Sequence, residues 1–477
     1  MRDDRELSLP FSRISELMPV WPEDLLPSIR RELAASRSKV IILDDDPTGT
    51  QTIRNVPVLT SWAVEVLAAE LRGPFPAFFV LTNSRSLPEE GARRLAREIG
   101  NNLRLAMGLA GVEANIISRG DSTLRGHFPA EVDELAVALD RNHLPRLLIP
   151  FFAEGGRFTI DDVHYVREGE RLLPAASTAF ARDATFGYRN SFLRKWVEEK
   201  SGGSIASGEV AAITLEDLRR GGPARVVELL LGLPDGATCI VNGADYRDME
   251  VLSVALLDAA RQGRDCLCRS AASFVRSRLG QDCGGLLKGG ELLTTSSVGG
   301  LFVVGSHIEK STRQLAALLA TGRVTPLELR VDELFDHSTR QAAIHRLSSQ
   351  ASELLGAGRD CAIFTSRRLH TGSDGSESLR IAGVVSSCLI ATVTAVAVKP
   401  RYLVAKGGIT SSDLATEGLK VARAMVIGQI LPGVPVWRLG EESRCPGMAY
   451  IVFPGNVGDD DALVRLHALL NQGRPRQ

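Results

Sequence analysis

The 477-residue sequence lacks the features that mark several large classes of protein. Its seven cysteines are odd in number and scattered, and no CxxC pair occurs, which argues against a disulfide framework and against a zinc site. Lys and Arg number 56 and Asp and Glu number 57, so the formal net charge is −1. The chain therefore has no basic surplus of the kind that a dedicated nucleic-acid or membrane-surface binder carries.

Long hydrophobic runs are missing as well. The first ten residues, MRDDRELSLP, contain no apolar run that could act as a signal peptide. The longest apolar stretch, residues 388–398, is interrupted by threonines and is far shorter than the roughly 20 residues of a membrane-spanning helix, so we interpret it as a buried element. We expect a cytoplasmic globular protein with neither a nucleic-acid nor a membrane partner.

Three well-known catalytic signatures are also absent. No GxxxxGK[ST] loop occurs, no GxGxxG follows a predicted strand, and no GxSxG is found. These gaps disfavour a P-loop enzyme, a dinucleotide-dependent hydride transfer and an esterase-type nucleophile. His164, His337 and His345 have no partner at metal-ligand spacing, and we expect them to be ordinary core or surface residues.

What the sequence does contain is a regular alternation of short β-branched apolar runs with amphipathic stretches. This alternation predicts an α/β protein with two α/β domains, each a mostly parallel sheet flanked by helices. We place the boundaries at an N-terminal arm 1–38, a first domain 39–270, a Gly/Ser-rich linker 271–300 and a second domain 301–477. The expected strands are 39–46, 77–84, 114–121, 146–152, 301–307, 324–331, 361–366, 401–408 and 449–456, and the clearest helices are 89–109, 129–142, 311–320 and 460–470.

Polar clusters follow three successive strands of the first domain: DDDPTGTQT (44–52), TNSRS (82–86) and SRGDSTLRGH (118–127). In open α/β sheets, ligands bind just beyond the carboxyl ends of the strands. Three carboxylates directly after an apolar run need a counter-charge or a metal if they are buried, although a capped turn with solvated acids is the alternative. Arg119 and Arg125 could hold a carboxylate or phosphate, or form a salt-bridge network. Together the clusters favour a small anionic ligand that is rich in hydroxyls.

The second domain places glycines and hydroxyls at its strand-to-helix junctions: GSH (305–307), KGGITSSDLA (406–415) and PGNVGDDDA (454–462). Glycines there let backbone N–H groups approach phosphate oxygens closely. Each turn alone could be merely tight, but three in one domain favour a nucleotide-phosphate site.

Five short motifs thus stand in order along the chain: DDDPTG (44–49), DSTLRG (121–126), GS (305–306), KGGITSSD (406–413) and PGN (454–456). As a set they resemble the four-carbon acid sugar kinases, a family formerly described as a domain of unknown function, some of whose members carry a Hrp-dependent type III effector label. The resemblance implies an acid-sugar-binding N-terminal domain, an ATP-binding C-terminal domain and phosphorylation of the terminal hydroxyl of threonate, erythronate or an oxidised relative. It also implies ATP and Mg²⁺ as cofactors. Pro47, His127 and Ile409 depart from the usual pattern and suggest a divergent branch.

On this basis we hypothesise roles for individual residues. Asp45 or Asp46 would accept the proton of the attacking hydroxyl, with Asp121 left open as a third candidate, and Arg125 or Arg119 would hold the substrate carboxylate. The turn at Gly407 and Gly408 would cradle the ATP phosphates. The metal ligands are not assigned, and a homodimer is one expected assembly. The remaining candidates are Thr48, Gly49, Ser122 and Thr123 for the substrate, and Ser306, Thr410, Gly455 and Asn456 for the nucleotide.

Two other classes of function remain open at this point. The chain could be an ATP-independent acid-sugar enzyme, such as an isomerase or dehydratase with a metal at Asp44–Asp46. It could also be a non-catalytic ligand-binding or effector protein on the same scaffold.

Overall fold

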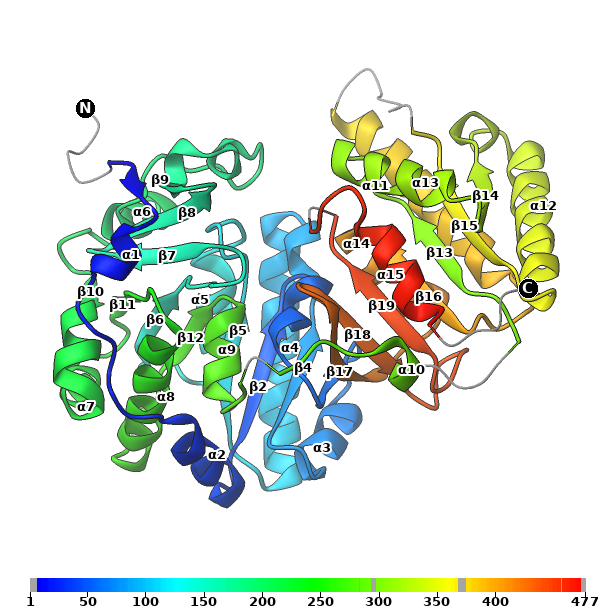
Figure 1. Ribbon diagram of the computed structural model, residues 1–477. Helices are drawn as coiled ribbons and strands as arrows, with labels where there is room; N and C mark the ends of the chain where they lie inside the picture. The colour runs from blue at the N-terminus through cyan, green and yellow to red at the C-terminus, as the bar shows by residue number, and fades with distance from the viewer. Residues whose placement is uncertain (1–6, 283, 293–296, 368–374, 456, 473–477) are drawn as a thin grey trace. The chain divides into compact units, whose positions relative to one another are not determined.

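The computed structural model describes residues 7–282, 284–292, 297–367, 375–455 and 457–472. The chain forms two compact units (Figure 1). Unit 1 comprises Met1–Thr52 and Ser61–Gly284, and unit 2 comprises Ile53–Thr60 and Gly285–Gln477. The predicted fold class, two α/β domains, is confirmed.

The two units differ from the predicted ranges in two places. Residues 53–60, expected in the first domain, belong to unit 2 because strand β3 (Val56–Leu59) pairs antiparallel with β17 (Arg423–Leu431). Residues 271–284, expected in the linker, belong to unit 1, where all seven residues of helix α9 (Ala272–Arg278) are buried.

Unit 1 is built on a sheet of seven parallel strands. Strand β2 is buried almost throughout because helices cover both faces, which explains its continuous apolar sequence. The chain leaves β2 to form β4 on one side and then returns to form β5 on the other, so β2 marks the point where the strand order reverses. The order across the sheet is β10 (Ala211–Ile213), β11 (Thr238–Val241), β6 (Arg146–Ile149), β12 (Leu267–Ser270), β5 (Ala114–Arg119), β2 (Lys39–Asp44) and β4 (Ala77–Leu81).

The helices of unit 1 follow the predicted pattern closely where the signals were strong. Helix α4 starts directly after Pro88 and ends at Gly111, whose φ of 66° is the left-handed conformation that suits glycine at a helix end. Helix α4 spans Glu89–Ala110. Other helices of unit 1 are α3 (Val64–Arg72), α5 (Ala130–Ala138), α6 (Leu193–Lys200), α7 (Gly222–Gly232) and α8 (Tyr246–Arg261).

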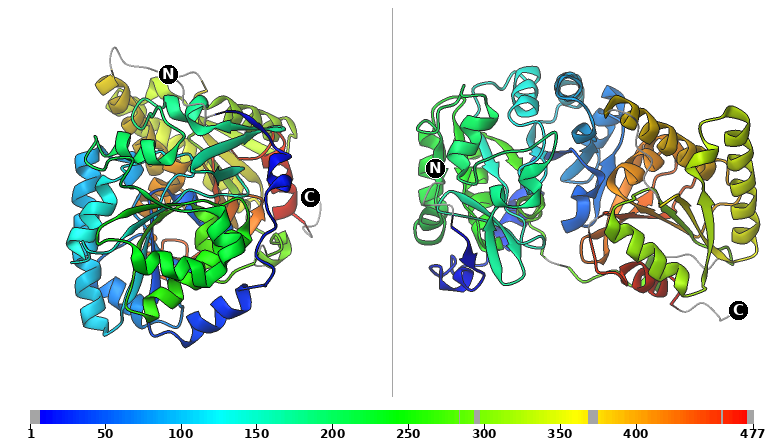
Figure 2. Two further views of the ribbon diagram at one scale, coloured as in Figure 1. Left: turned by 90° about the vertical axis from the view of Figure 1, so that its left-hand side faces the viewer. Right: turned by 90° about the horizontal axis from the view of Figure 1, so that it is seen from above.

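A small antiparallel sheet is formed largely by residues 157–174, where no strand was predicted. It has the order β1 (Leu9–Pro10), β9 (Arg171–Pro174), β8 (Val163–Glu168) and β7 (Arg157–Ile160). The N-terminal arm contributes β1 and the helices α1 (Arg13–Glu16) and α2 (Leu26–Ala35), and it runs along unit 1 as the dark blue segment of Figure 2. Arg219 anchors the arm by donating to the Met18 carbonyl at 2.7 Å.

Unit 2 has a mixed sheet. Its antiparallel part is β3, β17, β18 (Val434–Leu439) and β19 (Ala449–Phe453), and its parallel part continues with β16 (Tyr402–Lys406), β13 (Leu301–Val304), β15 (Asp360–Thr365) and β14 (Val324–Leu329). Residues 388–394 of the longest apolar run lie in helix α13, with Cys388, Leu389 and Val393 buried. The helices are α10 (Gly289–Leu292), α11 (Glu309–Ala320), α12 (His337–Gly356), α13 (Gly375–Thr394), α14 (Gly408–Asp413) and α15 (Ala462–Leu470).

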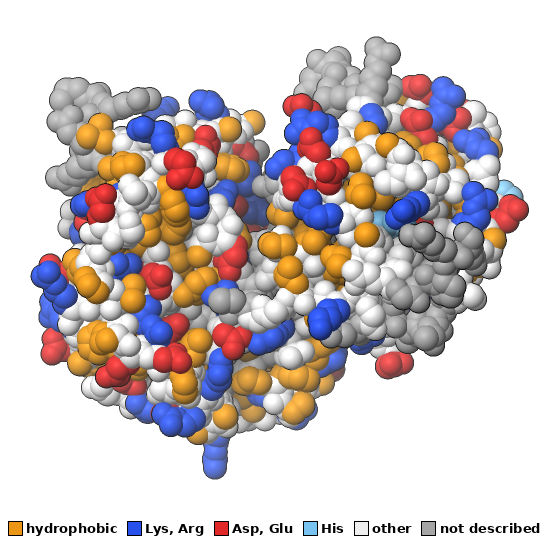
Figure 3. Space-filling model, viewed as in Figure 1, with side chains coloured by type: hydrophobic (Ala, Val, Ile, Leu, Met, Phe, Trp, Pro, Cys, Tyr) orange, Lys and Arg blue, Asp and Glu red, His pale blue; other side chains and the backbone are white. Residues whose placement is uncertain are grey.

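The surface agrees with the balanced composition. Basic and acidic side chains are intermixed on the face drawn in Figure 3. In the part of the chain that the structure describes, no helix has both the length and the apolar character required to cross a bilayer.

Candidate functional site

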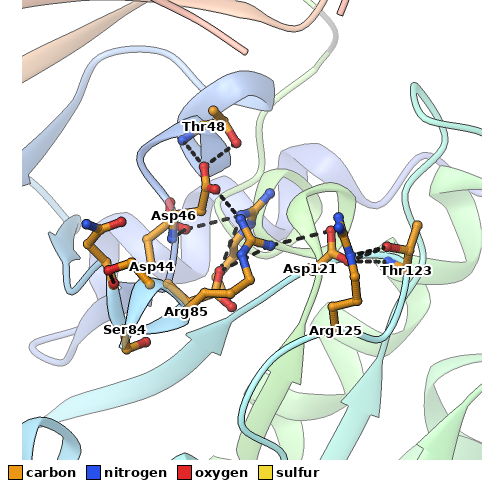
Figure 4. Close-up of polar contacts among 12 residues, drawn as sticks. Asp44, Asp46, Thr48, Ser84, Arg85, Asp121, Thr123 and Arg125 are labelled. Carbon is orange, nitrogen blue, oxygen red and sulfur yellow. Dashed lines mark hydrogen bonds and ion pairs between the residues drawn. The ribbon is translucent and has the colours of Figure 1, made fainter. Parts of the chain in front are cut away.

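The three polar clusters predicted in unit 1 come together at the carboxyl ends of β2, β4 and β5 (Figure 4). Asp44 is the last residue of β2, and Asp45 and Asp46 follow it before the turn η1 (Pro47–Thr52). The neighbouring strands supply arginines to these carboxylates, so the cluster has the counter-charge that its burial requires.

Arg85 is the central cation of this cluster, and the sequence analysis did not assign it. It lies in the short turn η2 (Ser84–Ser86) after β4. Its guanidinium pairs with Asp46 and lies 3.9 Å from Asp45 and 3.5 Å from Asp121. The signal was present, because Arg85 lies within the TNSRS cluster at the second strand end. Its central position becomes clear only from its ion pairs with aspartates that follow the other two strands.

Both carboxylate oxygens of Asp46 are engaged. One accepts hydrogen bonds from the Thr48 backbone N–H at 2.8 Å and the Thr48 hydroxyl at 2.5 Å, and the other pairs with Arg85. Burial would raise the pKa of Asp46, but the Arg85 charge and the Thr48 hydrogen bonds outweigh it and hold that pKa below its usual value. Asp46 is therefore ionised and locked in place, and Thr48 supports it.

Asp44 is fully buried and differs from its neighbours. Arg119 donates to one of its oxygens at 3.2 Å, whereas the other has no hydrogen-bond partner among the described residues. Burial raises the pKa of Asp44 to about 7, against the opposing charge of Arg119. Gly49 covers this carboxylate so closely that a Cβ at position 49 would lie 2.0 Å from the Asp44 Oδ2. Gly49 is thus needed for packing over Asp44, and Arg119, only 4% exposed, is a structural partner of the aspartates.

Asp45 keeps one oxygen without a hydrogen bond within the described part of the chain. That oxygen, Oδ1, lies 3.9 Å from both Arg85 and Arg119, and Oδ2 accepts from Arg269 at 3.4 Å. Arg269 comes from β12 and was also missed, because a single arginine inside the apolar run CLCRS gives little sequence signal. A Cβ on Gly120 would lie 2.0 Å from the Arg269 guanidinium, so the glycine leaves room for that side chain.

The third strand end contributes Asp121, which Arg85 connects to the first two clusters. Arg125 donates to Asp121 from Nε at 2.8 Å, and the Thr123 hydroxyl also bonds this carboxylate. Burial opposes ionisation of Asp121, but the charges of Arg85 and Arg125 prevail and lower its pKa strongly. Arg125 also lies 3.6 Å from Asp183 and packs 5.2 Å from the centre of the Phe180 ring.

Buried side chains hold the loop that carries Asp121 through its backbone carbonyls. His164 Nε2 donates to the Ser122 carbonyl at 2.8 Å and its Nδ1 accepts from the Thr159 hydroxyl at 2.9 Å. Tyr188 donates to the Thr123 carbonyl at 2.8 Å. Burial lowers the pKa of His164 to about 4, so this histidine is neutral at pH 7 and holds the loop rather than reacting. Ser122 takes part through its backbone.

A small cavity of about 20 Å³, lined by both apolar and polar side chains, adjoins Asp45 and has room for about one water molecule. Glu131 lines it together with Ser84, Ser118 and Arg269. Burial raises the pKa of Glu131, and its Oε2 has no hydrogen bond within the described residues. The cavity is too small for a sugar and fits a buried water beside Asp45.

The nucleotide candidates of unit 2 also meet in space. A Cβ on Gly305 would lie 2.3 Å from the Thr410 hydroxyl, and one on Gly407, whose φ is 114°, would lie 3.1 Å from the Ser306 Cβ. A Cβ on Gly455 would lie 3.4 Å from the Ser306 hydroxyl. Three strand ends, those of β13, β16 and β19, thus approach one another only because glycine occupies these positions. Gly408 begins α14 in the same turn, and Asn456 lies outside the described residues.

Two basic residues that the sequence analysis did not assign support these turns. Lys406 is fully buried at the end of β16 and donates to the carbonyls of Pro454 at 2.7 Å and Gly455 at 3.1 Å. Burial lowers its pKa to about 7. Arg367 donates to the Ser306 carbonyl at 2.7 Å and to that of Thr365 at 2.9 Å. Both hold the glycine turns through backbone carbonyls.

The donors of the unit 1 cluster do not fit a protein-held Mg²⁺. Within the described ranges, no group of three His, Cys, Asp or Glu residues is arranged to hold a metal ion. Asp46 and Asp121 already give their oxygens to Arg85, Arg125 and neighbouring hydroxyls. We therefore derive no chemical step through a metal at these aspartates.

Comparisons with solved structures support the fold. A Salmonella typhimurium LT2 protein, provisionally named a tRNA synthase, aligns with a TM-score of 0.66 at 16% identity over 90% of this chain and 98% of its own. A Haemophilus influenzae protein of the DUF1537 family aligns with a TM-score of 0.62 at 17% identity over 90% of this chain and 100% of its own. At these identities the likeness concerns the fold alone. No match is found among curated proteins.

Family models describe both halves of the chain. A model described as the sugar-binding N-terminal domain matches residues 40–278, and one described as the nucleotide-binding C-terminal domain matches residues 301–463. The first match contains the charged cluster at β2, and the second contains the glycine turns around Ser306. The chain therefore belongs to the family that joins a sugar-binding N-terminal domain to a nucleotide-binding C-terminal domain, the architecture of the four-carbon acid sugar kinases that its motifs resemble.

Proposed function

We propose that this protein is an ATP-dependent kinase that phosphorylates the terminal hydroxyl of a four-carbon acid sugar: threonate, erythronate, an oxo-tetronate or a close relative. The observation that carries the proposal is the pairing of two family domains, one sugar-binding and one nucleotide-binding, in one chain. Each domain has a constellation of the matching character, charged in unit 1 and glycine-rich in unit 2.

Asp45 is the proposed acceptor of the hydroxyl proton. A general base must have a free lone pair within reach of the proton it takes. Asp45 Oδ1 has no hydrogen bond among the described residues, whereas both oxygens of Asp46 are occupied. Asp46 then has the role of a positioning residue that fixes Arg85.

Phosphoryl transfer depends mainly on alignment and on neutralising charge. In unit 1, Arg85, Arg119 and Arg269 surround Asp45 and hold its orientation. In unit 2, we propose that the turns at Gly305–Ser306, Gly407–Gly408 and Gly455 bind the ATP phosphates through backbone N–H groups, supported by Lys406. Mg²⁺ is proposed to arrive with ATP as the companion of its phosphates.

The main alternative is an ATP-independent acid-sugar enzyme that uses a metal at Asp44–Asp46. The contacts of Asp46 disfavour that alternative, because Thr48 and Arg85 already engage both of its carboxylate oxygens. The non-catalytic alternative would not need the nucleotide-binding domain that matches residues 301–463.

The test is ATP consumption by the purified protein with Mg²⁺ across D- and L-threonate, D- and L-erythronate and their 2- and 3-oxo forms. Turnover with one acid would support the kinase and identify its substrate. If none is turned over while ATP raises the melting temperature, a kinase for another acid is favoured. If ATP neither turns over nor stabilises the protein, the proposal is wrong.

A further inference from the structure

Arg157 stands apart from the other arginines near the sugar domain's strand ends. It is the first residue of β7, in the small antiparallel sheet, and its side chain is half-buried. Its guanidinium carbon lies 5.3 Å from the centre of the Phe180 ring. Within the described residues its guanidinium makes no ion pair and no hydrogen bond, and its Nε is fully buried without a partner.

Every other arginine of the cluster is already committed to an acidic side chain. Arg85 pairs with three aspartates, and Arg119 is buried against Asp44. Arg269 pairs with Asp45, and Arg125 pairs with Asp121 at 2.8 Å. Releasing one of these arginines to a substrate would leave a buried carboxylate without its counter-charge, which is costly.

Arg157 nevertheless belongs to the same neighbourhood. Arg125 and Arg157 pack on the same ring, at 5.2 and 5.3 Å from the centre of Phe180. The charges of Asp121 and Arg125 both act on Arg157, whose pKa burial lowers. The predicted substrate loop therefore has beside it a partly buried cation that makes no ion pair or hydrogen bond within the described residues.

We infer that Arg157, packed on Phe180, binds the carboxylate of the acid substrate and makes the enzyme select acids over neutral sugars. This inference rests on the proposed function and names the residue that sets its substrate class. A planar guanidinium with unused donors can hold a carboxylate by two parallel hydrogen bonds. A neutral polyol would leave those donors unpaired, and the site would reject it for that reason.

The test measures binding and turnover separately. Calorimetry with the four threonate and erythronate isomers, without ATP, gives the affinity of the wild type, and the tetritols threitol and erythritol serve as neutral probes. Arg157→Gln should weaken acid binding by about 30-fold or more, the scale of a lost charge-assisted pair. Arg157→Lys keeps the charge but loses the planar guanidinium. Its acid affinity should therefore fall between that of the wild type and that of Arg157→Gln. Arg182→Gln, at an exposed arginine of η4 (Ala179–Arg182), the turn that carries Phe180, is the matched control.

In turnover assays the loss in Arg157→Gln should appear in KM with kcat nearly unchanged, and a merely structural role would lower both. The melting temperature and ATP binding of each variant show whether it is folded. Acid binding by Arg157→Gln equal to that of the wild type would overturn the inference even if the kinase is active. Acid binding that depends on Arg157, without any ATP-dependent turnover, would support the inference and count against the kinase. Binding of the tetritols as tight as that of the acids, or no acid binding by the wild type, would also overturn it.

Discussion

The strand ends of the two units present different kinds of polar group. In unit 1 they present a network of arginines and aspartates around Asp45 and Asp121. In unit 2 they present glycines, hydroxyls and backbone groups around Ser306, with Lys406 bonded only to carbonyls in the hydrogen bonds that the structure describes. Side-chain charge can distinguish one small acid from another, whereas backbone N–H groups suit phosphates, which are alike in every nucleotide.

This contrast also predicts how the strand ends of each unit respond to mutation. A charge network is tolerant of small shape changes but sensitive to the loss of one charge, because the remaining partner stays buried and unpaired. A glycine junction is indifferent to distant charges but cannot accept a Cβ where the atoms already touch. Four experiments test this contrast between the two units.

Removing the charge of Asp45 should have the largest effect. Asp45→Asn should lower kcat by about 1,000-fold, within the range expected for loss of a general base, and leave ATP binding nearly unchanged. Asp46→Asn keeps an oxygen that Thr48 can bond and should lose only about tenfold through looser positioning of Arg85. Steady-state kinetics with the identified acid measure both. Equal turnover in Asp45→Asn and wild type would remove Asp45 from the mechanism.

Adding a methyl group at Gly305 should weaken ATP binding in unit 2 without affecting acid binding in unit 1. In Gly305→Ala the new Cβ would meet the Thr410 hydroxyl at 2.3 Å, so ATP affinity should fall by about 100-fold while acid binding persists. Gly383→Ala, where a Cβ would meet nothing within 4 Å, is the control. Calorimetry with Mg·ATP and with the acid distinguishes the two losses, and an unchanged ATP affinity in Gly305→Ala would contradict the placement of the phosphates.

Lys406 should affect ATP affinity indirectly, through the turn whose carbonyls it bonds. Lys406→Met removes the hydrogen bonds to the Pro454 and Gly455 carbonyls, and ATP affinity should fall by about tenfold. Acid binding should stay at the wild-type value. A loss of acid binding as large as the loss of ATP binding would show that the lysine supports the whole fold instead.

The smallest effect concerns pH and the loop that carries Asp121. Because the pKa of His164 is lowered to about 4 in the folded protein, the unfolded chain binds more protons between about pH 4 and 6.5, and stability falls as pH falls through this window. Between pH 7 and 5.5 the loss should be about 1 kcal/mol. In His164→Gln this part of the pH dependence should disappear from denaturant titrations of unit 1. A variant that keeps the wild-type slope would assign the titration to another group.

The sequence predicted most of the parallel strands of both units, but not β10 or β12. The longer buried parallel strands have continuous apolar sequences that cannot be mistaken for amphipathic helices. The strand-end clusters were found for the same reason, since polar residues stand out directly after such strands. Arg269 was missed because it sits inside an apolar run and its role depends on Gly120, 149 positions away in the chain, leaving room for it. The hairpin of β17 and β18 and the antiparallel sheet of β7–β9 were missed because their strands are half-exposed or short and their pairings are set by tertiary contacts.

The pairing of β3 with β17 has a consequence for the folding of the chain during its synthesis. Leu59 pairs with Arg423, so β3 leaves the ribosome long before its partner strand exists. At about 5–20 residues per second, the intervening chain takes roughly 20 to 70 seconds to synthesise. Throughout that interval β3 lacks its β17 partner, while the sugar-binding unit is completed. The chain also passes three times between the units, after Thr52, Thr60 and Gly284, so a single proteolytic cut in the linker cannot release either domain whole.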